Sequence, residues 1–303
     1  MPARDSTIVG DEFRPGFRLQ TSWGWSMAAA FFLGEIGAGT FLVSLFFDFV
    51  NGLVLGLALT AVGKTAGHLL HLGQPFRAWR AIVKLNRSWV SRGLFAIILF
   101  TGFGIVHVLD AAGLTLGLLP PWLSPVVTGI AGAAAVAVML YQGLAMSHSP
   151  SISLWSTAVM PVLGFTYAAL LGVALVLALG ADSVLAGQPQ QIALLRTLEL
   201  ALIGYAAVMI LSMLHAARYG SPGGQKSVEL LLTGDLSGWF LIVVFGVGLM
   251  LPASIIVFAA QGATAAIATA AALSAGYFAF RMLVFKAAVY DPMQSFIAPV
   301  GRV

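Results

Sequence analysis

The sequence predicts an all-α integral membrane protein with eight transmembrane helices. Hydrophobic residues make up 59% of its 303 residues and charged residues only 9%, which leaves too few charges to cover a water-soluble domain of this size. The mean hydropathy of +0.96 agrees with this. The apolar stretches are continuous and roughly 20 residues long, as in spanning helices, whereas the strands of a membrane β-barrel alternate polar and apolar residues.

Spans and breaks follow one another regularly along the chain. The eight predicted spans cover residues 24–50, 53–72, 93–114, 123–146, 157–179, 192–217, 238–260 and 263–285. Turn-forming residues separate them at Asn51-Gly52, Gly73-Gln74-Pro75, Pro120-Pro121, Ser149-Pro150, Gln188-Pro189, Ser221-Pro222-Gly223-Gly224 and Gln261-Gly262. The first span is too long for a cleaved signal peptide, so we expect it to remain as a helix. Pro161 and Pro252 lie inside predicted spans, which predicts kinks there.

We expect these helices to form two four-helix bundles. The predicted segments are an N-terminal tail (1–22), a first bundle (23–146), a second bundle (147–285) and a C-terminal tail (286–303). A short internal sequence repeat favours this division into two bundles. The second span ends with His68 and His71 ahead of Arg77. The sixth span ends similarly, with His215 ahead of Arg218.

Basic residues predict the orientation in the membrane. An even number of spans puts both termini on one face, which we call side A, together with loops 73–92, 147–156 and 218–237. Side A carries thirteen Lys and Arg residues: Arg4, Arg14, Arg18, Arg77, Arg80, Lys84, Arg87, Arg92, Arg218, Lys226, Arg281, Lys286 and Arg302. The opposite face, side B, carries only Arg196. Because cytoplasmic loops are rich in Lys and Arg, we expect a cytoplasmic-membrane protein with both termini in the cytoplasm.

Two features of the composition exclude whole classes of site. The chain has no cysteine, so by itself it holds no iron–sulfur cluster, thiolate-bound metal or disulfide. We predict no metal site in it. The net charge of +4 is explained by basic residues beside the membrane, so we expect the lipid bilayer and not nucleic acid as a partner.

Glu35 and Lys64 are ionisable residues that lie inside the predicted spans, where charge is costly. Glu35 lies about twelve residues into the first span, a depth of roughly 18 Å at 1.5 Å per residue. Lys64 lies at a similar depth in the second span. A very short turn joins the two spans, so a Glu35–Lys64 pair is geometrically reasonable. It predicts either a buried ion pair that fixes helix packing or a proton relay in which both residues are catalytic.

Polar side chains converge on side A and predict a pocket there. Lys64, His68 and His71 fall at i, i+4 and i+7, on one face of a helix. An arginine-rich loop that starts at Arg77 follows directly, and Tyr141 reaches the same side near the end of the fourth span. Apolar walls with one or two hydrogen-bond donors and a titratable group suit a quinone, whose reduction takes up protons.

Aromatic residues surround this predicted pocket. The tryptophans near side A include Trp23, Trp25, Trp79 and Trp89, although a belt of interfacial tryptophans is also expected there. His148, just beyond the fourth span, arrives at the same face. We therefore include Trp25 and His148, with Arg77, among the expected quinone-binding residues.

Two other classes of function remain open. A b-type haem needs axial histidines from facing helices, and His71 with His215 could ligate one haem at side A. A mono-haem b membrane anchor is therefore one alternative, although we expect no haem. A proton-coupled transporter is the other. Glu35, Lys64 and Pro252 favour a transporter, but the concentration of polar residues on one face weakens it.

The most specific signal lies in the first five spans. It consists of WGWSMAAAFFLGEIGAGTFL (23–42), HLLHLGQPFRAWR (68–80) with RSWVSRG (87–93), and YQGLAMSHSPSISLWSTAVMPVLGF (141–165). These stretches resemble the NrfD/PsrC-like family, the membrane-anchor subunits of polysulfide-reductase-type complexes. The Leu-Gly-x-Pro turn, the Ser-Trp before the third span and the Trp-Ser-Thr…Pro entry to the fifth recur in the order typical of the family. Spans six to eight resemble the family in number and length.

The resemblance implies a function and partners. It implies a haem-free anchor that exchanges electrons between a quinone (menaquinone or ubiquinone) and an iron–sulfur, ferredoxin-like subunit. That subunit would serve a molybdenum- or tungsten-type catalytic subunit in a respiratory complex. The quinone pocket and the partner would both lie on side A, with loop 73–92 as the docking surface. The family has a quinone-binding tyrosine in the fourth helix, and Tyr141 stands at that position. With side A cytoplasmic, the catalytic partner would act on an intracellular substrate.

The first span departs from the family pattern. Family members of the polysulfide type carry asparagine and histidine in the first turns of helix one, where this chain has Met27 and Ala30. The set of quinone ligands is therefore not transferred whole. His71, Glu35 and His148 are the residues that could replace them.

Overall fold

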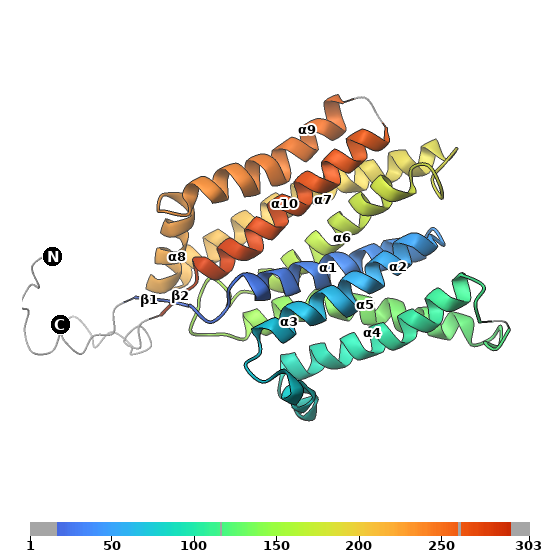
Figure 1. Cartoon of the computed structure of the whole chain (residues 1–303). Helices are drawn as coiled ribbons and strands as arrows, with labels where there is room; N and C mark the ends of the chain where they lie inside the picture. Colours follow the sequence, from blue (N-terminus) through green and yellow to red (C-terminus); the bar gives the residue numbers. More distant parts are fainter. Residues whose placement is uncertain (1–16, 116, 260–261, 292–303) are drawn as a thin grey trace, which may run out of the picture.

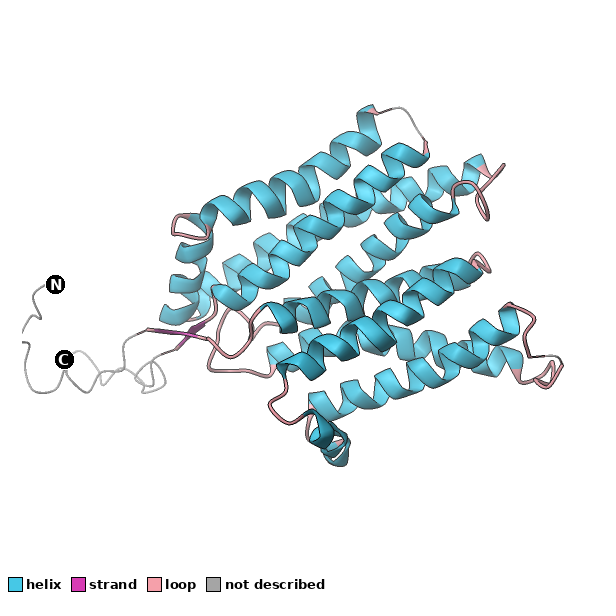
Figure 2. Ribbon diagram, viewed as in Figure 1, coloured by secondary structure: helices cyan, strands magenta, loops and turns pink. Residues whose placement is uncertain are grey.

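A computed structural model describes residues 17–115, 117–259 and 262–291 of the chain. In this part of the chain, long helices run side by side in one bundle, as Figures 1 and 2 show. Eight helical segments among the described residues are long and apolar enough to cross a membrane. The prediction of an all-α membrane protein with eight spans is therefore confirmed. The grouping into two four-helix bundles stays a prediction.

The described elements follow the predicted spans closely. In chain order they are β1 (Arg18–Leu19), α1 (Trp25–Leu45), α2 (Val50–Ala58), the π-helix η1 (Leu59–Lys64), α3 (Thr65–His71), the 3-10 helix η2 (Pro75–Lys84), α4 (Trp89–Ala111), α5 (Ser124–Ser147), α6 (Val159–Gly180), α7 (Pro189–Gly220), α8 (Pro222–Leu232), the π-helix η3 (Trp239–Met250), α9 (Leu251–Phe258), α10 (Ala263–Lys286) and β2 (Val289–Tyr290). The second span comprises α2, η1 and α3, and the seventh comprises η3 and α9.

The two prolines that predicted kinks lie near the start of helical segments. Pro161 is the third residue of α6, in a first turn where the missing N–H has no intrahelical partner to lose. Pro252 is the second residue of α9, directly after the π-helix η3. The change from π to α geometry at Pro252 is the kind of local adjustment that accommodates proline in a membrane helix.

One end of the bundle holds both described ends of the chain. β1 and β2 pair antiparallel there, with Arg18 opposite Tyr290, and η2 and α8 lie at the same end (Figure 1). The backbone N–H of Asp291 donates to the carbonyl of Ser151, 2.8 Å away, so the loop between α5 and α6 reaches this end too. These are the segments that the sequence predicts on side A.

The tails are described only in part. Residues 18–20 were expected to belong to the N-terminal tail, but the structure holds them against the end of α10. The Gln20 side chain is buried and donates to the carbonyl of Phe285 at 3.0 Å. The remainder of the two predicted tails, residues 1–16 and 292–303, lies outside the described residues.

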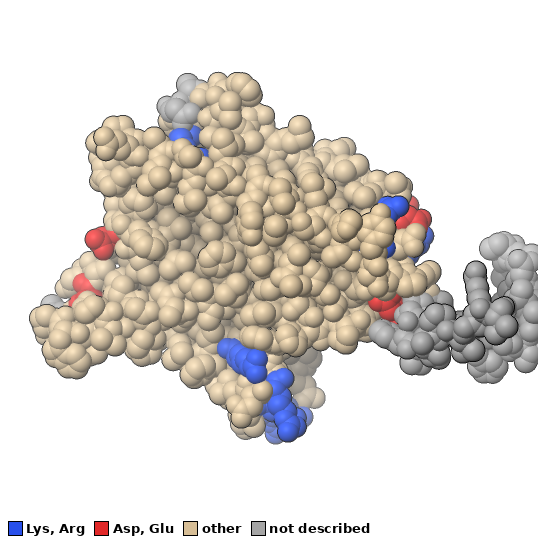
Figure 3. Space-filling model, turned by 180° about the vertical axis from the view of Figure 1, so that it is seen from behind, with Lys and Arg blue, Asp and Glu red and all other residues tan. Residues whose placement is uncertain are grey.

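On the face seen in Figure 3, the charged side chains that reach the surface lie near the edges of the molecule. Figure 3 shows a wide band of uncharged surface, with basic groups projecting at the lower edge where η2 lies. The assignment of Arg281 to the surface of side A is corrected, because this residue of α10 is fully buried. Side A therefore has one basic residue fewer than the thirteen expected. Three of them, Arg4, Arg14 and Arg302, lie outside the described residues.

Glycines let α1 approach its neighbours backbone to backbone. A Cβ atom at Gly39 would overlap the backbone of Ala168 in α6, and a Cβ at Gly172 would overlap the backbone of Gly39. A Cβ at Gly37 would likewise collide with Gly56 in α2. Small residues at these positions allow the close packing that stabilises helices in a membrane.

Substituting alanine for Gly39 is expected to lower the free energy of unfolding by about 1–3 kcal/mol, because the added methyl group pushes α1 away from α6. The matched control is Gly129→Ala in α5, where a Cβ meets nothing within 4 Å. Thermal unfolding midpoints in detergent compare the two. Equal midpoints for both variants would contradict the close α1–α6 contact.

Candidate functional site

A cavity of about 500 Å³ lies at side A between α1, α3, η2, α4 and α5. Most of its wall is apolar. The apolar lining includes Met27, Phe31, Leu69, Leu94 and Ile97. A cavity with largely apolar walls and a few convergent polar groups is the usual form of a small-molecule site.

Four of the predicted binding residues line this cavity: His68, His71, Arg77 and Tyr141. The two histidines share a face in the last turn of α3, which ends where Gly73 and the following proline break the helix. The Tyr141 hydroxyl lies 3.5 Å from Nε2 of His68. The predicted convergence of the second and fourth spans on side A is therefore present.

The Tyr141 ring depends on a glycine in the neighbouring helix. A Cβ at Gly93 of α4 would overlap the ring, so this position leaves the space that the ring occupies. Tyr141 is buried, with 8% of its surface exposed, and its hydroxyl is turned toward His68. The ring is thus held between α4 and α5 with its polar end at the cavity.

Lys64 lies behind the cavity wall and is fully buried. Its Nζ donates to the side-chain oxygen of Gln142 at 2.7 Å and to the carbonyl of Ala30 at 3.5 Å. Nζ also lies 4.9 Å from the centre of the Tyr141 ring, in a cation–π arrangement. Among the described residues no carboxylate lies within 4 Å of it. The hydrogen-bond partners of Nζ are therefore neutral oxygen atoms of an amide and a backbone carbonyl.

The predicted Glu35–Lys64 pair is not the one that forms. Glu35 pairs with Arg281 of α10, whose Nη2 donates to Oε1 and whose Nε donates to Oε2 at 3.1 Å. The Tyr277 hydroxyl also donates to Oε2. All three side chains are fully buried. The short turn between the first two spans favoured Lys64, but it carries no information about a partner 246 residues away.

Phe31 connects both charged groups to the cavity. Its ring lines the cavity and lies 5.5 Å from Nζ of Lys64 and 5.8 Å from Cζ of Arg281. Lys64, predicted as a catalytic residue, is therefore one side chain away from the cavity, whereas Glu35, the other predicted catalytic residue, is connected to Phe31 through Arg281.

Two predicted binding residues do not line the cavity. Trp25 opens α1 with 64% of its surface exposed, and the tryptophan that reaches the cavity is Trp23. His148 caps the end of α5 outside the cavity and accepts a hydrogen bond from Nε1 of Trp89, 3.0 Å away. Trp25 and His148 therefore lie outside this cavity, and their expected role in quinone binding stays a prediction.

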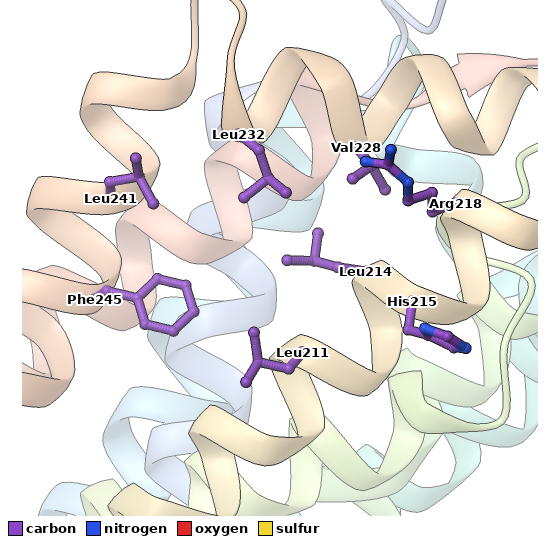
Figure 4. A pocket seen from close by; sticks show the side chains of 8 residues that line it. All are labelled: Leu211, Leu214, His215, Arg218, Val228, Leu232, Leu241 and Phe245. Atoms are coloured by element: carbon purple, nitrogen blue, oxygen red, sulfur yellow. The ribbon is translucent and has the colours of Figure 1, made fainter.

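His215 lines a different cavity, between α7, α8 and η3 (Figure 4). The histidine pair considered for a haem, His71 with His215, is thus divided between two cavities. Within residues 17–115, 117–259 and 262–291 no group of three or more His, Asp or Glu side chains could hold a metal ion.

Sequence reasoning missed three residues that hold the charged groups in place. Gln142 receives the Lys64 hydrogen bond and donates to the carbonyl of Phe31 at 3.1 Å. Tyr277 and Arg281 hold Glu35. The sequence does contain a signal for the last two of these residues. Tyr277 and Arg281 are spaced i, i+4 on an otherwise apolar helix. An arginine within a span is costly unless it is paired, so its presence predicts a buried partner.

Comparison with protein families decides what kind of protein has this architecture. The model of the family "Polysulphide reductase, NrfD" matches residues 15–291, a range that includes every described helix and strand. The chain belongs to the NrfD family. A search among curated proteins gave no match. As an NrfD protein, the chain is a membrane subunit of an oxidoreductase complex.

The cavity of this NrfD protein takes its polar groups from helices other than the first. Met27 lines the cavity with an apolar side chain, and Ala30 contributes only its carbonyl, as an acceptor for Lys64. His68 and His71 come from α3, Arg77 from η2 and Tyr141 from α5. Of the suggested replacements for the polar residues of helix one, His71 alone lines the cavity.

Proposed function

We propose that this NrfD subunit exchanges electrons between a quinone, menaquinone or ubiquinone, and a partner subunit, with the quinone bound in the side-A cavity. The observation that carries the proposal is the cavity of about 500 Å³, whose hydrogen-bonding side chains include His68, His71 and Tyr141. Apolar walls fit a ring and an isoprenoid tail, and the polar side chains fit the ring oxygens. Leu69 and Val90 line the cavity and are 40% and 59% exposed on the outer surface, where quinone dissolves in lipid.

The chain's own residues supply what proton-coupled electron transfer requires. Reduction of a quinone takes up two protons with two electrons. Tyr141 can donate a hydrogen bond at the cavity, and His68, 3.5 Å away, can return a proton to it. The Lys64 ammonium favours negative charge on the cavity side of Tyr141. Glu35, paired with the Arg281 that lies against Phe31, would be the second ionisable group of a proton route.

We propose that an iron–sulfur, ferredoxin-like subunit docks on loop 73–92 and connects the quinone site to a molybdenum- or tungsten-type catalytic subunit. No residue of η2 is buried, and the helix carries Arg77, Arg80 and Lys84. Arg77 also lines the cavity, so a partner on η2 would lie over the quinone. Because side A holds most of the basic residues, we infer that it faces the cytoplasm and that the catalytic partner acts on an intracellular substrate.

Replacing Tyr141 with phenylalanine is expected to reduce quinone-coupled turnover about tenfold or more, because the hydroxyl that meets the quinone oxygen is lost. Turnover of the catalytic partner with an artificial dye should be unchanged. Both rates are measured on the complex that co-purifies with the chain in mild detergent. The control is Tyr205→Phe, a tyrosine of α7 that is 45% exposed and distant in sequence from the cavity residues.

An equal loss of both activities would contradict a quinone role for Tyr141. The same preparation tests the partners through metal analysis and a redox-difference spectrum. Iron with molybdenum or tungsten supports the proposed complex. A b-type haem band would favour the mono-haem anchor, and a colourless polypeptide without partners would favour a transporter.

A further inference from the structure

A second groove lies at side A, between α7, α8 and η3 (Figure 4). Its volume is about 360 Å³. The wall is apolar, with Leu211 from α7, Leu232 from α8 and Phe245 from η3. The polar lining residues are His215 and Arg218, both on α7, and no Asp or Glu lines the groove.

The groove opens on the outer surface of the bundle. Leu211 is 56% exposed and Leu241 is 48% exposed, although both belong to segments that cross the membrane. A groove of leucine side chains on this surface faces hydrocarbon and not water, so the ligand that it meets at highest concentration is a lipid chain.

Exposed aromatic residues indicate the depth of the groove. Tyr219, next to Arg218, is 73% exposed, and Trp239 at the start of η3 is 64% exposed. Exposed tyrosine and tryptophan at the ends of spans lie at the level of the lipid headgroups. Arg218 is therefore at headgroup level, and Leu211 lies about 10 Å deeper along α7 at 1.5 Å per residue.

The charge at the mouth of the groove has no partner among the described residues. Arg218 is exposed, and it makes no ion pair or side-chain hydrogen bond with any described residue. The nearby Lys226 of α8 differs, since its Nζ contacts the Glu229 carboxylate at 2.9 Å. The Arg218 guanidinium is thus available for a phosphate, which it can bind through two parallel hydrogen bonds.

We propose that this groove is a binding site for an anionic phospholipid. One acyl chain would lie along Leu211, Leu241 and Phe245, and the phosphate would bind Arg218. A zwitterionic headgroup would bring a second cation beside Arg218, and no acidic side chain lines the groove to receive it. Basic pockets between membrane helices on the cytoplasmic side are suited to anionic lipids for this reason. The site is separate from the quinone cavity and does not depend on it.

Native mass spectrometry tests the proposal on the full chain, purified in mild detergent with the subunits that accompany it. The probe is an equal mixture of phosphatidylglycerol and phosphatidylcholine with identical acyl chains. The wild-type protein is expected to retain about five times more phosphatidylglycerol than phosphatidylcholine. This ratio is the effect that one basic residue has on binding to an anionic lipid. Arg218→Gln should abolish this preference. Lys226→Gln, which removes an already paired cation, should keep it.

A second variant tests the groove itself. Leu241→Trp fills the apolar part while Arg218 remains, so it should lower the retention of both lipids. If Arg218→Gln does not yield a folded protein, this variant still decides the question. Unchanged retention in Leu241→Trp overturns the proposal, as does a wild-type protein without preference or an Arg218→Gln variant that keeps it. Quinone-coupled turnover should be normal in every variant, so these results and those for Tyr141 are independent.

Discussion

Arg281→Met is expected to destabilise the folded protein by about 3–5 kcal/mol, because it leaves the Glu35 carboxylate buried without its partner. Both side chains are fully buried, and Arg281 holds both carboxylate oxygens. Tyr277 would remain as a single donor to Glu35. One neutral donor does not offset the cost of an isolated charge in the membrane interior.

The measurement is the thermal unfolding midpoint in detergent, together with the amount of monodisperse protein. The double variant Glu35→Gln with Arg281→Met removes both charges and should recover much of the loss, because a neutral amide is cheaper to bury. Lys286→Met, an exposed position on the same helix, is the control for losing a basic residue and should be near neutral. If Arg281→Met were as stable as Lys286→Met, the ion pair would not hold α1 to α10.

Lys64→Met is expected to lower quinone-coupled turnover by about two orders of magnitude, the effect that a well-placed acid–base group has on rate. The substitution keeps the length of the side chain but removes the cation 4.9 Å from the Tyr141 ring and the donor to Gln142. Dye-coupled turnover of the partner should stay close to wild type.

Gln142→Met separates the chemical role of Lys64 from its packing role. This variant removes the acceptor at 2.7 Å but leaves the ammonium group in place, so its turnover should fall less than that of Lys64→Met. Both rates are measured against menaquinol and ubiquinol analogues. Equal defects in the two variants, or loss of dye-coupled turnover, would assign Lys64 to packing instead of proton supply.

The transmembrane architecture could be predicted because lipid imposes it one segment at a time. Each span must satisfy its own backbone hydrogen bonds and be apolar over the thickness of the bilayer. The predicted span 263–285 accordingly matches Ala263–Lys286 closely. The packing between spans depends on contacts between residues far apart in the chain. The sequence pattern of each span therefore does not determine how the helices group into bundles.

Part of the site could be predicted because the position of a residue within its span gives its depth in the membrane. His68 and His71 share a helix face by their spacing alone, and Tyr141 lies near the same end of its span, so their convergence follows from depth. The Glu35–Arg281 pair joins the first and last spans, and only the folded arrangement brings them together. Arg281 lies five residues before the end of α10, where the same spacing is compatible with a surface charge.

The sequence did not show which tryptophan near the start of the first span lines the cavity. Trp23 and Trp25 stand on either side of Gly24. Which of the two lines the cavity depends on the residue at which α1 begins. The helix begins at Trp25, with Gly24 as its N-terminal cap. Trp23, in the non-helical approach, stacks on Trp155 with ring centres 5.0 Å apart and lines the cavity.

The pairing of the first and last spans sets a condition on how the protein is made. Glu35 enters the membrane when α1 is inserted, but Arg281 is synthesised 246 residues later. At about 5–20 residues per second, translation supplies the partner only after roughly 12–50 s. During that interval the carboxylate is protonated, hydrated or shielded by the insertion machinery. A chain that stops before α10 never gains the arginine, so its Glu35 would stay without the partner that it has in the complete fold.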